Sequence, residues 1–477
     1  MIPVILTGRI EEKKVLLTAM TSGESELIAI VGRRRVGKTF LVRATYGDQI
    51  DFELVGMQSG KTAEQLQNFA IKLMELNSEN ELLSIPVSWL EAFHLLIRNL
   101  ENKKMTRKRI IFLDELPWLA SPRSGFIEAL GYFWNSWASK NNVIVVICGS
   151  AASWMIRKII HHSGSLHNRV TKRIFLQPFT LSETEDFLKS RNVYLDHYQI
   201  IQLYMCMGGI PHYLKEVQPG RSAMQNIMEI CFTKQGLLHD EFDKLYPALF
   251  DHAEQHLSIV TALAGKWKGL TQTEIIRYSG RASGGSLTRI LEELEQSGFI
   301  SSYTPFDKKK KDSLYRLTDE YSLFYLKFIK GKKIAMTRTG STLQQTNEWK
   351  TWTGYAFESI SLKHVDKIKD ALGIRGIYST SSGFTHKGDA EKPGTQIDLL
   401  IDRSDHTINL CEIKFYSGPV EISKNDAMTI RDKVSVFRSV TGTKKQIFVT
   451  LISTFGLKPN KHSIGLIDHS ITMESLF

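Results

Sequence analysis

The sequence contains few cysteines, and these are scattered along the chain. Its four cysteines are Cys148, Cys206, Cys231 and Cys411, and no two of them form a C-x-x-C pair. Disulfide-stapled secreted domains and zinc ribbons carry cysteines in close, regular pairs. We therefore expect neither a disulfide framework nor a zinc ribbon, and we expect a protein of a reducing compartment such as the cytoplasm.

Long apolar segments are also absent. No stretch of about 18 or more consecutive apolar residues occurs, which argues against a membrane-spanning helix. The N-terminal sequence MIPVILTGRIEEKK lacks the long apolar run and small-residue cleavage site of a signal peptide. These absences predict a chain with no signal peptide and no membrane partner.

Length and charge set the next bounds. A chain of 477 residues is too long for one hydrophobic core, because single cores stop growing near ~250–300 residues. We expect three or four modules. The 61 Lys and Arg residues outnumber the 50 Asp and Glu residues, giving a formal net charge of +11. A basic chain suits a polyanionic partner, although charge alone does not identify one.

Short apolar runs alternate with helical patterns in the N-terminal third. The runs lie at 26–31, 109–113, 143–148 and 173–176, and helical patterns lie between them, at 62–76 and 125–138 for example. Buried parallel strands have such continuous apolar sequences. The alternation predicts an α/β fold with a doubly wound parallel sheet.

The first apolar run is followed by GRRRVGKT, which fits the phosphate-binding pattern G-x-x-x-x-G-K-[ST]. Its glycines let the backbone N–H groups curl around phosphate oxygens, and the following helix adds its positive end. The lysine reaches the β- and γ-phosphates, and the threonine hydroxyl binds Mg²⁺. The predicted ATP-binding residues of this loop are Gly32, Arg33, Arg34, Arg35, Val36, Gly37, Lys38 and Thr39.

The second apolar run ends in two acids, IIFLDE at 110–115. Asp114 at the strand end is expected to hold Mg²⁺, and Glu115 to polarise the attacking water. No N-K-x-D guanine-reading motif occurs, so the sequence favours ATP over GTP. These residues predict an ATP-hydrolysing site that uses Mg²⁺.

An ordered set of further motifs resembles the archaeal-type ATPases, a group of the AAA-like STAND P-loop NTPases. The matching segments are TGRIEE (7–12), GRRRVGKT (32–39), IIFLDELPWL (110–119), ICGSAASWM (147–155), LHNRVTKRIFLQPFT (166–180) and GGIPHYL (208–214). The resemblance implies a P-loop core over 1–180 and a helical lid over 181–250.

The resemblance also implies roles for single residues. Gly8 and Arg9 would lie near the adenine, Ser150 would face the γ-phosphate, and Pro211 would pack on the base. Arg169 would sense phosphate charge, within one chain or across the interface of a homo-oligomer. Family members often have L-Y-G-R where this chain has LHNR, so only the arginine carries over.

Residues 270–306 read as a helix, a Gly/Ser turn, a second helix and a strand, the order of a winged helix. We place this module at 251–330, with a linker at 331–348. Lys308, Lys309, Lys310 and Lys311 would lie at the wing tip and could contact phosphates. The second helix would present Arg281, Ser283, Ser286, Thr288 and Arg289 to nucleic acid. The alternative is a protein-docking module whose lysines form a solvated loop.

The C-terminal segment, 349–477, resembles the PD-(D/E)xK nuclease superfamily, with a restriction-endonuclease-like α/β fold. Asp398 lies in one apolar run, and Glu412 and Lys414 lie in the next. Because strand side chains alternate, the three would share a face if the strands pair. Asp398 and Glu412 would then bind a metal and Lys414 would assist catalysis, with Glu358 nearby. The alternative is a degenerate fold whose charges form a salt-bridged cluster.

The sequence thus predicts an ATPase that controls a module acting on nucleic acid, with DNA favoured over RNA. The competing hypothesis is a STAND-type nucleotide switch that acts through protein partners, with an inactive nuclease-like tail.

Overall fold

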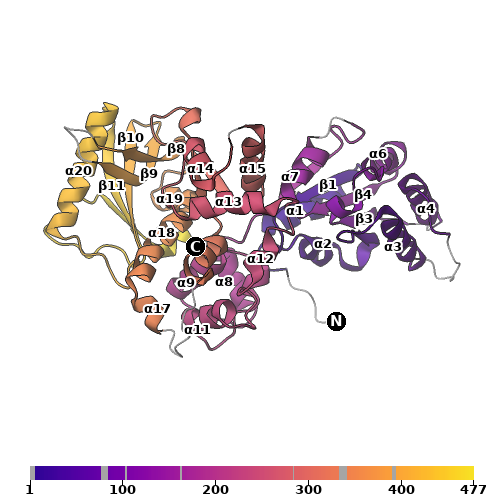
Figure 1. Ribbon diagram of the computed structural model, residues 1–477, viewed down its shortest axis with the longest axis horizontal. Helices are drawn as coiled ribbons and strands as arrows, with labels where there is room; N and C mark the ends of the chain where they lie inside the picture. The colour runs from indigo at the N-terminus through magenta and orange to yellow at the C-terminus, as the bar shows by residue number, and fades with distance from the viewer. Residues whose placement is uncertain are drawn as a thin grey trace. The chain divides into compact units, whose positions relative to one another are not determined.

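The computed structural model describes residues 6–76, 84–102, 105–161, 164–282, 284–331, 341–388 and 394–477. The chain divides into two compact units, and each is described by itself (Figure 1). The first unit comprises Met1–Pro178, Pro247–Asp251 and Glu292–Gly298, and the second comprises Phe179–Tyr246, His252–Leu291 and Phe299–Phe477. In the described part of the chain, no helix combines the length and apolar character needed to cross a membrane.

A five-stranded parallel sheet forms the centre of the first unit. Its strands are β1 (Glu26–Val31), β2 (Ile50–Val55), β3 (Arg109–Asp114), β4 (Val143–Gly149) and β5 (Lys172–Phe175). Their order in the sheet is β2-β3-β4-β1-β5, and every pair is parallel. β1 and β4 are buried along their whole length, as their continuous apolar sequences require. The predicted parallel α/β sheet is confirmed, and β2 is a strand that the sequence did not indicate.

Helices pack around this sheet (Figure 1). They are α1 (Ile10–Thr21), α2 (Lys38–Tyr46), α3 (Thr62–Met74), α4 (Trp89–Glu101), α5 (Leu116–Leu119), α6 (Phe126–Ser136) and α7 (Ala152–Met155). Aromatic side chains of α3, α4 and α6 form one cluster against the sheet: the rings of Trp89 and Phe126 lie 4.7 Å apart, and those of Phe93 and Phe133 lie 4.9 Å apart. This core fixes the strand ends that carry the motif residues.

The second unit begins with short helices. They are α8 (Leu181–Lys189), α9 (His197–Met207), α10 (Pro211–Leu214), α11 (Ala223–Ile227) and α12 (Glu241–Leu245). The helix α16 (Glu320–Phe324) packs against α9, far along the chain from it. Tyr321 ties the segments together, because its hydroxyl donates to Leu238 O at 2.8 Å and accepts from Phe242 N at 3.0 Å.

Three helices and a two-stranded hairpin lie between these segments in the chain. They are α13 (Ala253–Ala264), α14 (Gln272–Ser279), α15 (Gly285–Gln296), β6 (Ile300–Tyr303) and β7 (Leu314–Leu317). β6 and β7 are antiparallel, and Leu270 pairs with Tyr315 beside them. The elements follow the order that the sequence indicated for 270–317, with Lys308–Lys311 between the strands.

A second five-stranded sheet occupies the C-terminal part. Its strands are β8 (Ser379–His386), β9 (Thr395–Arg403), β10 (Thr407–Lys414), β11 (Gln446–Ser453) and β12 (His469–Thr472), in the order β12-β11-β10-β9-β8. β8, β9 and β10 are antiparallel neighbours, whereas β10, β11 and β12 run parallel. The two apolar runs that carry Asp398, Glu412 and Lys414 form β9 and β10, and the sequence did not indicate the two edge strands.

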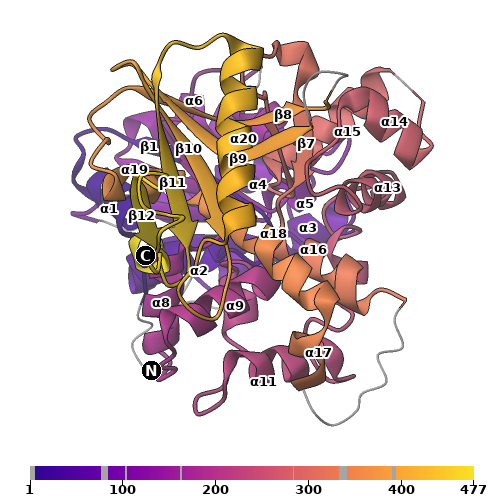
Figure 2. The same ribbon diagram turned by 90° about the vertical axis from the view of Figure 1, so that its left-hand side faces the viewer.

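Helices α17 (Ser341–Gln345), α18 (Asn347–Lys363), α19 (Val365–Ala371) and α20 (Lys424–Thr441) accompany this sheet. Figure 2 shows α20 lying across the sheet, and Phe437 of this helix packs against Phe384 of β8 with ring centroids 5.0 Å apart. Ser423 and Asp426 start α20 with a reciprocal capping box.

The hairpin β6–β7 is joined to this C-terminal sheet. Phe306 N donates to Gly383 O at 2.8 Å, and the ring of Phe306 contacts Phe437. Trp267 stacks on Tyr355 of α18 with centroids 5.1 Å apart and rings 6° from parallel. Residues 332–340 of the linker predicted at 331–348 lie outside the described part of the chain, and α17 begins at Ser341.

Candidate functional site

The loop between β1 and α2 is held in a tight curl by its glycines. A side chain on Gly32 would bring its Cβ within 2.5 Å of Leu176 O, so only glycine fits there. Gly37 has φ 96° and Arg35 has φ 72°, both in the region that side-chain-bearing residues avoid. A curl of this kind is what an anion-binding loop requires to present its backbone N–H groups to a phosphate.

Lys38 is buried at the first turn of α2, with 5% of its surface exposed. Its Nζ donates to Gly32 O at 2.9 Å, to Arg33 O at 3.0 Å and to Ser150 Oγ at 3.2 Å. Burial lowers the pKa of Lys38, against the opposing charges of Glu115 and Asp114. The ammonium group therefore sits within the loop that the sequence assigned to phosphates.

Thr39 and Asp114 converge from α2 and the end of β3. Thr39 Oγ1 donates to Asp114 Oδ2 at 2.6 Å. Burial raises the pKa of Asp114, while the hydrogen bond from Thr39 acts in the opposite direction. A hydroxyl and a carboxylate at one point are the hard oxygen ligands that Mg²⁺ prefers, so these two residues fit the predicted magnesium site.

Glu115 and Ser150 form a direct contact that the sequence did not indicate. Ser150 Oγ donates to Glu115 Oε1 at 2.5 Å, and Ser150 N donates to Oε2 at 3.1 Å. The sheet order explains the contact, since β4 lies between β1 and β3 and ends beside both the loop and the acids. Glu115 has φ 48°, a left-handed conformation that is uncommon for a residue with a side chain. Ser150 thus bridges Lys38 and Glu115.

The other predicted nucleotide residues lie in more varied surroundings. Arg9 is 4% exposed, and its Nη2 donates to Val36 O at 3.3 Å, which places it against the loop. Gly8 before it has φ 67°. Arg34 is partly exposed, and Arg169 is exposed after the turn that starts at Leu166.

Pro211 lies in the second unit, at the start of α10. Gly209, two residues earlier, leaves no room for a side chain, because a Cβ would lie 1.9 Å from Phe179 O. Phe179 N donates to Gly209 O at 2.6 Å, so this segment is tied to the start of the second unit. The predicted contact of Pro211 with a nucleotide base stays a prediction.

In the C-terminal sheet, the register brings the predicted acids to one face. β9 and β10 are antiparallel with Leu399 opposite Cys411, so the next pair along is Asp398 and Glu412. Directly opposite residues share a face of the sheet, and Lys414 lies on that face two residues farther. Burial, then the charge of Glu358, then that of Glu412 raise the pKa of Asp398 to about 7, and Lys433 and Lys414 act in the opposite direction.

Two cations pair with the neighbouring acids. Lys433 Nζ of α20 lies 2.5 Å from Glu412 Oε1, and Arg316 Nη2 of β7 lies 2.6 Å from Glu358 Oε1. Arg316 lies 42 residues before Glu358 in the chain and was not singled out from the sequence. A cleft of about 450 Å³ opens here, lined among others by Lys268, Lys350, Tyr355, Glu358, Gln396, Asp398, Glu412, Lys414 and Lys433.

A metal ion at this cleft would compete with Lys433 for the carboxylate of Glu412. Within the described ranges, no group of three or more His, Cys, Asp and Glu side chains is arranged to hold a metal ion. Asp398 and Glu412 supply two carboxylates from neighbouring strands, a donor set that suits a hard divalent cation. Lys433 already holds one of them, so a metal fits only when this ion pair opens.

The residues between α13 and β7 that were predicted to contact nucleic acid lie in different surroundings. Lys308–Lys311 are all exposed between β6 and β7, as expected for a basic tip. Arg281, which was predicted to face nucleic acid, donates from Nε to Ser258 Oγ of α13 at 2.9 Å. Ser283 lies outside the described residues. Nucleic-acid contact by this segment stays a prediction.

Comparisons with known proteins agree with the first unit's geometry. Residues 6–217 match the model of a family described as an ATPase domain predominantly from Archaea. The chain is 22% identical over 416 residues to an uncharacterized protein of Methanocaldococcus jannaschii, covering 86% of this chain and 88% of that protein.

Solved structures give weaker likenesses. A Walker-type ATPase of Pyrococcus abyssi is 19% identical with a TM-score of 0.49, over 67% of this chain and 96% of that one. The ORC2 protein of Aeropyrum pernix is 15% identical with a TM-score of 0.42, over 68% of this chain and 94% of that one.

The motif, the loop geometry and the family match lead to one conclusion for the N-terminal part. The chain carries a P-loop ATPase domain of archaeal type over residues 6–217.

Proposed function

We propose that ATP hydrolysis in the first unit controls the action of the second unit on nucleic acid. The observation that carries the second half of this proposal is the meeting of Asp398, Glu412 and Lys414 in one cleft with further lysines. Such a mixture of acids and cations suits a phosphodiester backbone, whose negative charge the lysines attract.

In the ATP site, each residue takes a role that its position supports. Lys38 binds the β- and γ-phosphates, and the backbone of Gly32 to Gly37 surrounds them. Thr39 and Asp114 hold Mg²⁺, which when bound neutralises charge on the phosphates. Glu115 orients and polarises the attacking water.

Ser150 couples two of these groups. The hydroxyl oxygen of Ser150 lies 2.5 Å from Glu115 Oε1 and 3.2 Å from Lys38 Nζ, so it contacts both the acid and the phosphate-binding lysine. Gly8 and Arg9 precede α1, and Arg9 contacts the loop through Val36 O. Arg169 and Pro211 complete the proposed set. The exposed position of Arg169 suits a residue that reaches its phosphate from another subunit of a homo-oligomer.

In the C-terminal cleft, we propose metal-dependent cleavage with Asp398 and Glu412 as ligands. The metal ion, when bound, supplies a Lewis acid for the scissile phosphate. Lys414 lies on the same face, where its ammonium group stabilises the developing negative charge. Lys268 and Lys350 at the cleft bind flanking phosphates.

A second candidate is a nucleotide switch whose C-terminal unit binds a partner without cutting. The ion pairs Lys433–Glu412 and Arg316–Glu358 favour it, because they neutralise two of the three acids without a metal. This arrangement is the salt-bridged cluster expected of an inactive nuclease-like fold.

A cleavage assay separates the two candidates. Duplex DNA, single-stranded DNA and RNA are incubated with the full chain and Mg²⁺ or Mn²⁺, with and without ATP. Cleavage that Asp398→Ala abolishes and Asp402→Ala preserves supports the nuclease; Asp402 lies on the same strand but pairs with Lys445. Binding without cleavage by the unaltered protein supports the switch, and neither activity would contradict the proposed role.

A further inference from the structure

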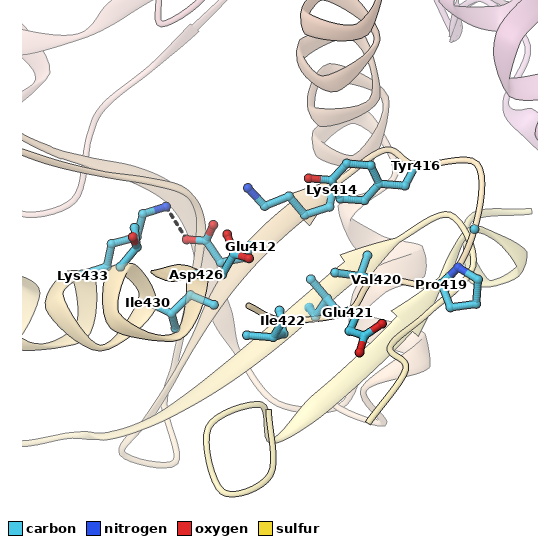
Figure 3. Close-up of a pocket in the computed structure, with 13 residues that line it drawn as sticks. Glu412, Lys414, Tyr416, Pro419, Val420, Glu421, Ile422, Asp426, Ile430 and Lys433 are labelled. Atoms are coloured by element: carbon cyan, nitrogen blue, oxygen red, sulfur yellow. Dashed lines mark hydrogen bonds and ion pairs between the residues drawn. The ribbon is translucent and has the colours of Figure 1, made fainter. Parts of the chain in front are cut away.

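A second hollow lies beside the cleft described above. It has a volume of about 370 Å³ and opens between the end of β10, the segment 416–422 and the first half of α20 (Figure 3). Glu412, Lys414, Tyr416 and Lys433 line both hollows, so the two meet at these four side chains.

The chemistry of the lining changes across the hollow. Near the cleft it is charged, with Glu412, Lys414 and Lys433 (Figure 3). The rest of the lining combines the apolar side chains of Pro419, Val420, Ile422, Ile430 and Leu451 with Tyr416, Gly418 and the polar residues Glu421, Asp426 and Thr429. A ligand that is anionic at one end and apolar at the other matches this division.

The apolar wall is held in place by the backbone. Val420 N donates to Gly456 O and Val420 O accepts from Lys458 N, both at 2.8 Å. Thr454 Oγ1 accepts from Tyr416 N at 3.1 Å and donates to Tyr416 O at 2.5 Å. The hollow is therefore preformed, which reduces the entropy that a ligand must lose on binding.

We infer that this hollow binds a single unstacked base of the nucleic acid whose adjoining phosphate lies at Lys414 and Lys433. Tyr416 is 52% exposed, and its ring offers a face on which a base can stack. A volume of about 370 Å³ is near the lower end of ligand pockets, which span ~300–1,000 Å³, and suits one nucleotide rather than a base pair.

The inference rests on the proposed action of the second unit on nucleic acid, and it names the substrate class. A base that enters this hollow no longer stacks on the neighbouring bases of its strand. The protein therefore selects single-stranded, terminal or flipped nucleotides over nucleotides inside an intact duplex.

Binding is measured on the full chain in EDTA, with a short DNA strand and the blunt duplex of the same sequence. The single strand is expected to bind more tightly. Tyr416→Ala should weaken its binding on the order of tenfold, and Tyr416→Phe should restore it, because the ring face supplies the stacking. Thr429→Trp, which fills the hollow from the exposed side of α20, should weaken binding without altering the core.

Two variants serve as matched controls. Tyr378→Ala removes a tyrosine that is 78% exposed, and Met428→Trp adds a large side chain at an exposed position next to Thr429; neither residue lines the hollow. Both are expected to bind the single strand as the unaltered protein does.

A fluorescent base reports insertion directly. With 2-aminopurine placed at each position of the strand in turn, one position should be quenched, and Tyr416→Ala should relieve that quenching. Equal binding of both DNAs, no quenching and no effect of Tyr416→Ala or Thr429→Trp would overturn the inference and leave a water-filled crevice. Quenching without cleavage under Mg²⁺ or Mn²⁺ would instead refute only the nuclease, and binding of neither DNA would refute both.

Discussion

Arg316 of β7 and Glu358 of α18 form an ion pair of 2.6 Å, with side chains only 14% and 8% exposed. Arg316 Nε also donates to Trp267 O at 3.1 Å, and its guanidinium lies 5.5 Å from the centre of the Tyr303 ring. The hairpin β6–β7 therefore supplies a cation to the C-terminal cleft. A module that the sequence separates from this cleft by a linker takes part in its electrostatics.

Removing Arg316 should destabilise the second unit. Arg316→Ala leaves the buried carboxylate of Glu358 without its cation, and losses of this kind cost about 3–5 kcal/mol. The free energy of unfolding is measured with urea, and adding Glu358→Gln should recover part of the loss. Arg375→Ala, at an ion pair whose arginine is 79% exposed, should cost less than about 1 kcal/mol. Equal effects of the two substitutions would contradict the buried-pair account.

His364 should make the second unit less stable in mild acid. Its Nδ1 lies 2.8 Å from Ile360 O and its Nε2 accepts from Leu181 N at 3.2 Å, an arrangement that only the neutral ring satisfies. Burial lowers the pKa of His364 below its ordinary 6.5. The unfolded chain thus binds this proton first, and stability falls as the pH drops below about 6.5, by at most ~1.4 kcal/mol per pH unit.

His364→Gln should flatten this pH dependence. Urea unfolding at a series of pH values measures it, and His406→Asn, at an exposed histidine, should keep the dependence of the unaltered protein. An unchanged pH slope in His364→Gln would show that another group causes the acid sensitivity.

Lys433 should compete with a divalent cation at the C-terminal cleft. Its ammonium lies 2.5 Å from Glu412 Oε1, so Lys433→Gln removes a competitor and leaves Glu412 to the metal. Titration calorimetry with Mn²⁺ should show tighter binding, and Lys424→Gln on the exposed start of the same helix should show none of this gain. Weaker binding in Lys433→Gln would mean that the lysine supports the metal site instead.

The lysines between β6 and β7 should govern the salt dependence of nucleic-acid binding. If Lys308–Lys311 contact phosphates, their replacement by Gln lowers the slope of log affinity against log salt by about 0.9 for each lost contact. Replacement by Arg keeps the charges and should keep the slope. An unchanged slope in the Gln variant would show that these lysines form a solvated loop and do not contact phosphates.

The nucleotide loop could be predicted from the sequence because its requirements are local. Gly32 and Gly37 are needed by the curl itself, and Lys38 and Thr39 follow at fixed spacing on the helix. The contact of Ser150 with Glu115 could not be predicted in the same way. It depends on β4 lying between β1 and β3, and strand order in a parallel sheet is a nonlocal property.

The side-chain contacts of the C-terminal cleft could likewise be predicted only in part. Alternation along two strands predicted a shared face for Asp398, Glu412 and Lys414, and the β9–β10 register gives that face. The pairing of Arg316 with Glu358 and of Lys433 with Glu412 brings distant segments together, and no periodicity in the sequence encodes it. The edge strands β8 and β12 were missed because their polar sequences lack an apolar run.

The most direct test of the account is steady-state ATP hydrolysis by the unaltered protein and by Glu115→Gln, with ATP binding measured in parallel. The unaltered protein should hydrolyse ATP in a Mg²⁺-dependent way. Glu115→Gln should bind ATP with similar affinity yet lose hydrolysis by about 10²-fold or more, because the amide cannot polarise water as the carboxylate does. Lys38→Ala should lose binding itself. Hydrolysis by Glu115→Gln at the parental rate would contradict the assignment of the ATPase site.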